Sequence, residues 1–333
     1  MDQLSAHIDR GWDFVQKGDA RGAEASARQA LELDPQFPDA HNLLGLAAAL
    51  DGDAYEAIEH FGQAIALDET YIEAMFNAAE VYINPLEQYD DAISMCEQAL
   101  AITESDDEVI EALLLTFDAM LGKGDLASAR SVVVRIPSGP YENPNHTFQV
   151  GRAFFEIGDL ARAAPLIEEA ANKDPLNGDA WYYLGLIRDE RGDSHGATSA
   201  FIRVREMDLL EPPLAWSPSR DLFQQIVSVS IKALPQRLRH LVEHADVYLA
   251  DSPGIEVVAD GVDPRALLHL ETEPLPELLG PSRGRVFVYQ RNVEHTAGMP
   301  DRLEATIIEA FEQEIEAALA DSAGSITKST DLN

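Results

Sequence analysis

Apolar residues recur along the first two thirds of the chain in blocks of 34 positions. Two consecutive blocks, 144–177 and 178–211, align without gaps. Each block holds small and large apolar residues at helical spacings and therefore predicts a pair of helices. The matched positions hold Gly151, Phe154, Gly158, Ala163, Ala170 and Pro175 in the first block, and Trp181, Leu184, Gly185, Gly192, Ala197 and Phe201 in the second.

Four blocks nearer the N-terminus repeat this pattern, and the match becomes weaker from residue 4 towards residue 135. Residues 4–37 and 38–71 carry it fully, whereas 72–106 has about one inserted residue near Asn84-Pro85. Residues 108–135 retain part of it and end at a break rich in Pro, Gly and Asn. Because one helix pair cannot bury its apolar face alone, about six pairs are expected to stack.

The residue types at the matched positions have distinct packing roles. Gly45 lies where two helices of a pair must approach closely, and Gly52 supports the tight turn between them. Phe61 fills the space between neighbouring pairs, and Pro35 ends the second helix of the first pair. The same roles are expected at the equivalent positions of the other blocks.

The pattern resembles the tetratricopeptide repeat, whose signature is matched by Trp181, Leu184 and Gly185. The resemblance implies a superhelix whose first helices line a concave groove that binds a peptide or helix of another protein. The offsets that would face this groove hold Trp12, Leu46, Phe76, Phe148, Phe155 and Tyr182.

These side chains have a second interpretation, because aromatic residues at helical spacing are commonly packing residues. Some members of the family clamp a partner's C-terminal carboxylate with Lys, Asn and Arg. The matching offsets here hold Ile8, Trp12, Leu43, Glu73 and Asn77, of which only the asparagine fits. A carboxylate clamp is therefore not expected.

The charge balance narrows the class of partner. The chain has 24 Lys and Arg residues against 59 Asp and Glu, which disfavours nucleic acids and anionic membrane surfaces. Residues 1–213 hold 14 basic and 40 acidic residues, so a groove there should favour a basic partner. The alternative is a solvated acidic surface that maintains solubility.

The helical pattern changes at residues 211–220, which contain three prolines. Beyond this break, residues 221–244 predict a helix that is interrupted or ended near Pro235. Residues 246–250 and 285–290 predict strands, and 302–320 an amphipathic helix. The predicted organisation is therefore a mostly α protein with a repeat array over 1–213, a small α+β domain over 214–320 and a disordered tail over 321–333.

The second domain resembles the bacterial minimal zincin-like metallopeptidases over about residues 221–320. The segments that carry this resemblance are ALPQRLRHLVEHADVYLADSP, VDPRALLHLE, RVFVYQRNVE and a helix from about DRLEATII. In that family the last helix bears H-E-x-x-H, in which two His hold Zn²⁺ and the Glu is the general base.

At the matching positions this chain has Glu309 and Gln313 in place of the two histidines, and Ala310 in place of the base. Because alanine cannot accept a proton from bound water, the resemblance implies the fold without the activity. Glu309 and Gln313 could hold a harder cation such as Ca²⁺ or Mg²⁺, but acidic residues on the solvated face of a helix are ordinary.

An inverted zincin motif, H-x-x-E-H, is formed by His240, Glu243 and His244, with Glu314 as a conceivable third ligand. Short motifs of this kind arise by chance, so no metal or cofactor is expected. The leading hypothesis is a non-catalytic interaction scaffold or adaptor, and the rival is a metal-dependent hydrolase that uses these three residues.

The single cysteine and the N-terminal segment bear on the compartment. Cys96 occupies a large-residue position of a second helix, where a packed, inert thiol is expected. One cysteine forms no intramolecular disulfide, and the N-terminus lacks a secretory pattern. No apolar run is long enough to span a membrane, so the sequence predicts a cytoplasmic protein.

Overall fold

The computed structural model describes residues 3–141, 143–271 and 284–330, with side chains described up to residue 320. The chain forms two compact units, residues 1–174 and 175–333. Within the described residues no helix is both long enough and apolar enough to cross a lipid bilayer.

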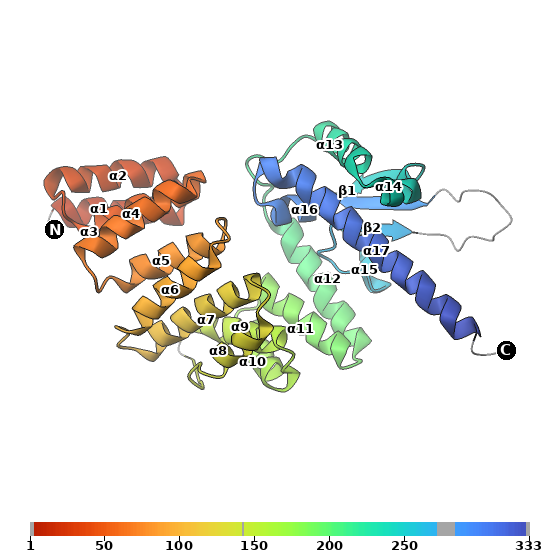
Figure 1. The fold of residues 1–333 in the computed structure, drawn as a ribbon, viewed down its shortest axis with the longest axis horizontal. Coiled ribbons are helices and arrows are strands. Elements are labelled where there is room, and N and C mark those ends of the chain that lie inside the picture. Colours follow the sequence, from red (N-terminus) through yellow and green to blue (C-terminus); the bar gives the residue numbers. More distant parts are fainter. Residues whose placement is uncertain (1–2, 142, 272–283, 331–333) are drawn as a thin grey trace. The chain divides into compact units, whose positions relative to one another are not determined.

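The first unit consists of helix pairs whose members pack against each other and against the next pair (Figure 1). The predicted repeats are confirmed, and the weak block over 108–135 also forms a pair. The helices are α1 (Gln3–Gln16), α2 (Ala20–Leu33), α3 (Pro38–Asp51), α4 (Ala54–Leu67), α5 (Ile72–Ile83), α6 (Tyr89–Leu100), α7 (Asp106–Gly122), α8 (Leu126–Val133), α9 (Pro144–Glu156) and α10 (Leu160–Lys173).

A Gly-Asp dipeptide forms the turn inside most pairs. Gly52 has a φ of 88°, a backbone conformation that residues with a side chain rarely adopt. The carboxylate of the following Asp53 caps the next helix by accepting a hydrogen bond from the Glu56 N–H at 3.0 Å. The third pair departs from this rule, since Glu87 has a φ of 54° and Gln88 caps α6 without a side-chain hydrogen bond. The equivalent aspartates that cap second helices are Asp19, Asp125, Asp159 and Asp193.

The two helices of a pair approach each other closely at the glycines for which this was predicted. A β-carbon on Gly45 would lie 2.4 Å from Cε1 of Phe61, which is fully buried. The ring therefore uses the space that any side chain on Gly45 would fill, and the two helices pack at this contact.

The second unit joins the sixth helix pair to a small α+β module. Its three strands have the order β1-β3-β2, with β1 parallel and β2 antiparallel to β3 (Figure 1). The elements are α11 (Gly178–Glu190), α12 (Ser194–Leu210), α13 (Arg220–Ala233), α14 (Gln236–Val242), β1 (Asp246–Ala250), α15 (Ile255–Ala259), β2 (Leu268–Glu271), β3 (Arg285–Tyr289), α16 (Gln290–Ala297), a 3₁₀ turn (Pro300–Arg302) and α17 (Leu303–Thr330).

One hydrophobic core unites the sheet with the helices of this module. Val286 and Val288 of β3 pack with Phe223 of α13 and with Ile307 and Phe311 of α17. Along the strands, the residues between these core positions point to the other face of the sheet. On that face the rings of Tyr248 and Phe287 stack with their centroids 5.3 Å apart.

The α+β module differs from its sequence prediction in several elements. β2, α15 and α16 were not predicted, because each is too short for its periodicity to be distinctive. Helix α17 extends to Thr330, whereas residues 321–333 were expected to be disordered; residues 331–333 lie outside the described part. The sixth pair, placed with the repeats by sequence, lies in the second compact unit.

Candidate functional site

The predicted groove positions lie on first helices, but they differ in exposure. Trp12, Leu46, Phe76 and Phe155 are half-buried on α1, α3, α5 and α9. Phe148 is only 4% exposed, so its assignment to a ligand-binding surface is corrected to a packing role. Thr147 and Val150 of α9 are also buried, so this part of the helix packs in the interior.

A set of polar residues, of which the sequence analysis considered only Asn77, joins neighbouring first helices. Asn77 donates a hydrogen bond to the side-chain oxygen of Asn42 at 2.9 Å, and Asn42 donates to the Tyr71 hydroxyl at 3.3 Å. That hydroxyl donates to Asp39, also at 3.3 Å. Burial, followed by the Asp39 charge, raises the pKa of Tyr71, so the phenol stays protonated and available as a donor.

A second polar contact joins α7 to α9. The His146 side chain is 3% exposed, and its two ring nitrogens lie 3.1 Å from Asp107 and 3.1 Å from Glu111. Arg152 binds both carboxylate oxygens of Asp118 at 2.8 Å. Burial raises the pKa of Asp118 and the Arg152 charge opposes that rise.

The carboxylates of α5 and α7 are close enough to influence each other. Desolvation first, and then the charge of Glu111, raise the pKa of Glu80 although this residue is exposed as a whole. Glu73, Phe76 and Glu80 are spaced at three and four residues and therefore share one face of α5. This face combines a half-buried aromatic ring with two carboxylates.

The expectation for Cys96 is confirmed. The thiol is fully buried on α6, and burial raises its pKa to about 12. At neutral pH the group is a thiol rather than a thiolate, so it is a poor nucleophile and a poor metal ligand.

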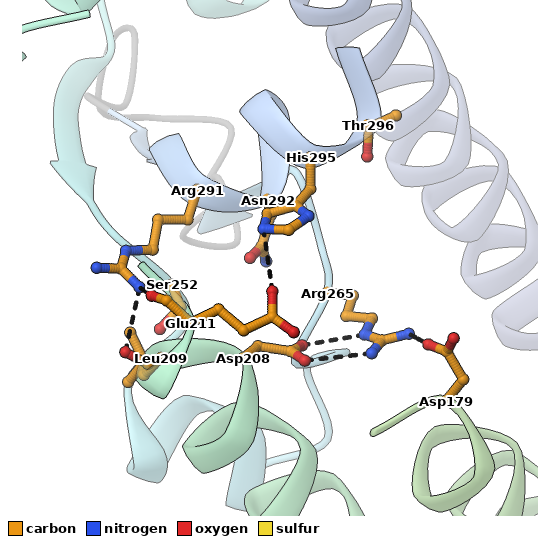
Figure 2. A pocket seen from close by; sticks show the side chains of 10 residues that line it. All are labelled: Asp179, Asp208, Leu209, Glu211, Ser252, Arg265, Arg291, Asn292, His295 and Thr296. Carbon is orange, nitrogen blue, oxygen red and sulfur yellow. Dashed lines mark hydrogen bonds and ion pairs between the residues drawn. The ribbon is translucent and has the colours of Figure 1, made fainter. Parts of the chain in front are cut away.

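A polar cavity of about 370 Å³ opens in the second unit, between the sixth helix pair and the α+β module (Figure 2). Arg291 of α16 donates to the carbonyl oxygens of Leu209 and Glu211 and so caps the end of α12. The Glu211 carboxylate lies 3.5 Å from the His295 ring. The lining residues are Asp179, Asp208, Leu209, Glu211, Ser252, Arg265, Arg291, Asn292, His295 and Thr296.

Arg265 is bound in this cavity by two carboxylates and an aromatic ring. Its guanidinium binds both oxygens of Asp208, at 3.0 and 3.2 Å, and donates to Asp179 at 2.6 Å. It also lies 4.9 Å from the ring centroid of Tyr182. Burial opposes the charge, but the hydrogen bonds to Asp208 and Asp179 outweigh it and raise the pKa of Arg265.

Tyr182, a predicted groove residue, is engaged within the second unit. Its hydroxyl donates to the Asp263 carboxylate at 2.6 Å, and burial followed by the Asp263 charge raises the pKa of the phenol. Sequence reasoning could not pair Tyr182 with Asp263 or Arg265, because the loop that carries them lies far along the chain.

The structure places the positions compared with the zincin motif on two sides of α17. Glu309 and Gln313 are exposed, whereas Ala310 is 7% exposed and belongs to the hydrophobic core. The described residues contain no group of three or more His, Cys, Asp or Glu side chains arranged to hold a metal ion.

The H-x-x-E-H residues lie at the exposed end of α14. The His240 ring nitrogen is 2.8 Å from Glu243, and His244 lies 3.8 Å from the same oxygen. Glu314, considered as a third ligand, lies 3.9 Å from His269 instead. The hydrogen bond from His240 lowers the pKa of Glu243, as expected for a local surface ion pair.

Comparison with known proteins agrees with the helix-pair architecture. One family model of the tetratricopeptide repeat matches residues 8–72 and 149–212, and a second model of the same repeat matches residues 74–110. The fold resembles pilF of Pseudomonas aeruginosa, with 17% identity and a TM-score of 0.52 over 63% of this chain and 93% of that one.

Two further solved structures have comparable similarity. PilW, a type IV pilus biogenesis factor, is 18% identical with a TM-score of 0.52, over 62% of this chain and 94% of its own. A chain of the APC/C hetero-tetramer Cut9-Hcn1 is 13% identical with a TM-score of 0.51, over 62% of this chain and 41% of its own. At these identities the comparison supports a shared fold.

Proposed function

We propose that this chain, whose residues 8–72, 74–110 and 149–212 are tetratricopeptide repeats, is a cytoplasmic interaction scaffold or adaptor. Its first helices bind a segment of another protein that carries basic residues. The α+β module is a non-catalytic second surface, and neither a cofactor nor a resident metal is part of the function.

The observation that carries this proposal is the face of α5 that holds Glu73, Phe76 and Glu80. The aromatic ring of Phe76 offers apolar contact, and burial, followed by the neighbouring charge of Glu111, raises the pKa of Glu80. A Lys or Arg side chain of the partner, placed between Glu80 and Glu111, would reduce the repulsion between these two carboxylates. The net negative charge of residues 1–213 would also attract such a segment over longer distances.

The proposal is tested with two labelled peptides and the full chain. One is an amphipathic helix with lysines on its polar face, and the other has glutamates at the same positions. We expect the lysine peptide to bind and to weaken as salt rises to physiological levels, because exposed charges are screened over about 8–10 Å. Equal affinity for both peptides would refute the basic partner.

Matched variants locate the contact. Glu73→Gln with Glu80→Gln should weaken lysine-peptide binding, because both carboxylates lie on the proposed face. Glu97→Gln changes an exposed carboxylate on α6, the second helix of the same pair, and should leave binding unchanged. If the Glu97 variant loses as much affinity as the double variant, the attraction is a property of overall charge rather than of the α5 face.

For the α+β module we propose a zincin-like ancestry without peptidase activity. The support is the order of helix, strands and final helix along the module. Glu309 and Gln313, at the positions compared with the two histidines, are exposed one turn apart on α17. Neither residue supplies an imidazole, and Ala310 supplies no base. The purified protein should therefore show background peptidase activity with or without added Zn²⁺.

A further inference from the structure

The loop that holds Asp263 and Arg265 covers the helix face that the repeat register assigns to ligand binding. Tyr182 lies at a groove offset of the sixth pair, and Asp179, three residues earlier, shares its face of α11. Both side chains contact this loop, through the 2.6 Å bonds from Arg265 to Asp179 and from Tyr182 to Asp263.

We infer that the Asp263–Arg265 loop is an intramolecular ligand of the sixth helix pair, and that Asp179, Tyr182 and Asp208 form a binding site for an arginine of a partner protein. This inference rests on the proposed function, since it assumes that first-helix faces of the repeats recognise protein segments. It identifies the recognised group at this position as a guanidinium flanked by an acidic residue.

The chemistry of the site matches arginine more closely than lysine. Asp208 presents both oxygens to two guanidinium nitrogens, and Asp179 takes a third. The Tyr182 ring adds a cation–π contact to the planar group. A lysine ammonium is a point charge that cannot reproduce the paired bonds to Asp208.

The Arg265 side chain can leave its partners without disrupting the core, whereas the loop backbone is held by hydrogen bonds from Asn292 to the carbonyl oxygens of Pro264 and Ala266. Asp263 and Arg265 are outside the hydrophobic cluster of the α+β module, and the Arg265 side chain remains 32% exposed. The site opens onto the 370 Å³ cavity, which leaves room for an incoming side chain. Exchange of one arginine for another therefore requires only that the Arg265 side chain swings out of the site.

An apolar rim beside the site provides further contact area. Leu176 and Leu210 are 84% and 85% exposed, and they line a second depression that shares Asp179, Asp208 and Arg265 with the cavity. A partner segment with an apolar residue next to its arginine would cover this rim. Since the internal loop has a high effective concentration, wild-type protein should bind such a segment weakly.

The test uses a fluorescein-labelled peptide with the sequence of residues 261–267, Gly-Val-Asp-Pro-Arg-Ala-Leu, and the full chain. In Arg265→Ala the internal arginine is removed and the site is left empty. We expect this variant to bind the peptide at least tenfold more tightly than wild type, measured by fluorescence anisotropy. Adding Asp208→Asn to that variant should abolish the gain, as should replacing the peptide arginine by glutamine.

A folded Arg265→Ala variant that binds no better than wild type would overturn the inference. If thermal unfolding shows that this variant is not folded, a second variant is used in its place. Since Tyr182→Phe would remove the same hydrogen bond from the peptide, it serves only as a control, and the deciding variant is Asp263→Ala, which weakens the internal loop and leaves Asp179, Tyr182 and Asp208 intact for the peptide. Binding to Asp263→Ala should exceed that of wild type, and no gain would again refute the site.

The outcome is separable from that of the proposed function. The double variant Glu73→Gln, Glu80→Gln should not affect binding of the 261–267 peptide. If the lysine helix still binds while this peptide does not, the arginine site is wrong and the scaffold proposal stands. If this peptide binds the Arg265→Ala variant but the lysine helix does not bind the protein, the arginine site stands and the basic partner of the scaffold proposal is wrong.

Discussion

The ring of Phe201 in α12 packs directly on Gly185 in α11, so that a β-carbon on Gly185 would lie 2.4 Å from Cε1 of the ring. Gly45 and Phe61 have the same relationship in the second pair. The two contacts lie in different compact units, so the 34-residue spacing of the sequence corresponds to a repeated packing geometry.

Gly185→Leu should therefore destabilise the protein by about 1–3 kcal/mol or more, because the larger side chain overpacks the contact with Phe201. Urea unfolding followed by circular dichroism measures the change. Gly62→Leu is the matched control, since Gly62 lies in α4 with nothing within 4 Å of an added β-carbon. If both substitutions have the same effect, the helix crossing is not the cause.

The turn of the third pair can be improved. Gln88 has φ and ψ of −91° and 66°, close to the −88° and 73° of Asp125, whose carboxylate caps α8. Gln88→Asp should add the missing cap and stabilise the protein by about 1 kcal/mol, measured by urea unfolding. Gln88→Ala provides no acceptor and should give no gain in stability. If Gln88→Asp and Gln88→Ala stabilise the protein equally, the added cap is not the cause.

Acid stability should depend on the capping aspartates. The side-chain and backbone hydrogen bonds from Ser128 lower the pKa of Asp125 below its ordinary value of 3.8. Its stabilisation is thus complete above the pKa of the unfolded chain and is lost as pH falls through the lower folded pKa. Asp125→Asn keeps a capping oxygen without a titratable group.

The free energy of unfolding of wild type and Asp125→Asn should therefore converge as pH falls below about 4, because protonation removes the charge advantage of the aspartate. Asp13→Asn, at an exposed position of α1, serves as the comparison. A constant difference between wild type and Asp125→Asn from pH 7 to pH 3 would contradict this prediction.

A zinc site should be creatable on α17. Glu309→His with Gln313→His places two imidazoles one helical turn apart on exposed positions, and the variant should bind Zn²⁺, measured by calorimetry. It should not cleave peptides, because the general base is absent. Glu309→Ala with Gln313→Ala is the control, and failure of the histidine pair to bind Zn²⁺ would remove the support for zincin-like ancestry.

Restoring the base should carry a stability cost that the sequence did not predict. Ala310 lies in the core with Ile307 and Phe311, so Ala310→Glu would bury a carboxylate among apolar side chains. We expect a lower unfolding midpoint for this variant in the histidine background, and an unchanged midpoint would mean that α17 can rotate to expose the position.

Local packing explains why the repeats were predictable. Gly185 and Phe201 lie close in sequence, and their spacing is the same wherever a helix pair recurs. The Gly-Asp turn could have been predicted as well, since Asp53 and Asp193 each follow the turn glycine that the sequence analysis identified.

Long-range contacts explain what the sequence could not predict. Nothing in the spacing of residues indicates that Arg265 reaches Asp179 or that Asn292 donates to the carbonyl oxygen of Pro264. Phe148 was assigned to the groove because position within the repeat fixes a helix face only approximately.

The parallel pairing of β1 with β3 also bears on the order of folding. Each helix pair closes through a short turn, whereas the sheet forms only after Asp246 meets Arg285 across the residues that separate them. Because loop closure over a longer segment is slower, refolding should show a fast phase from the repeats and a slower phase from the α+β module. A nascent chain would thus expose the first helices of the repeats before the loop with Arg265 is made and covers α11.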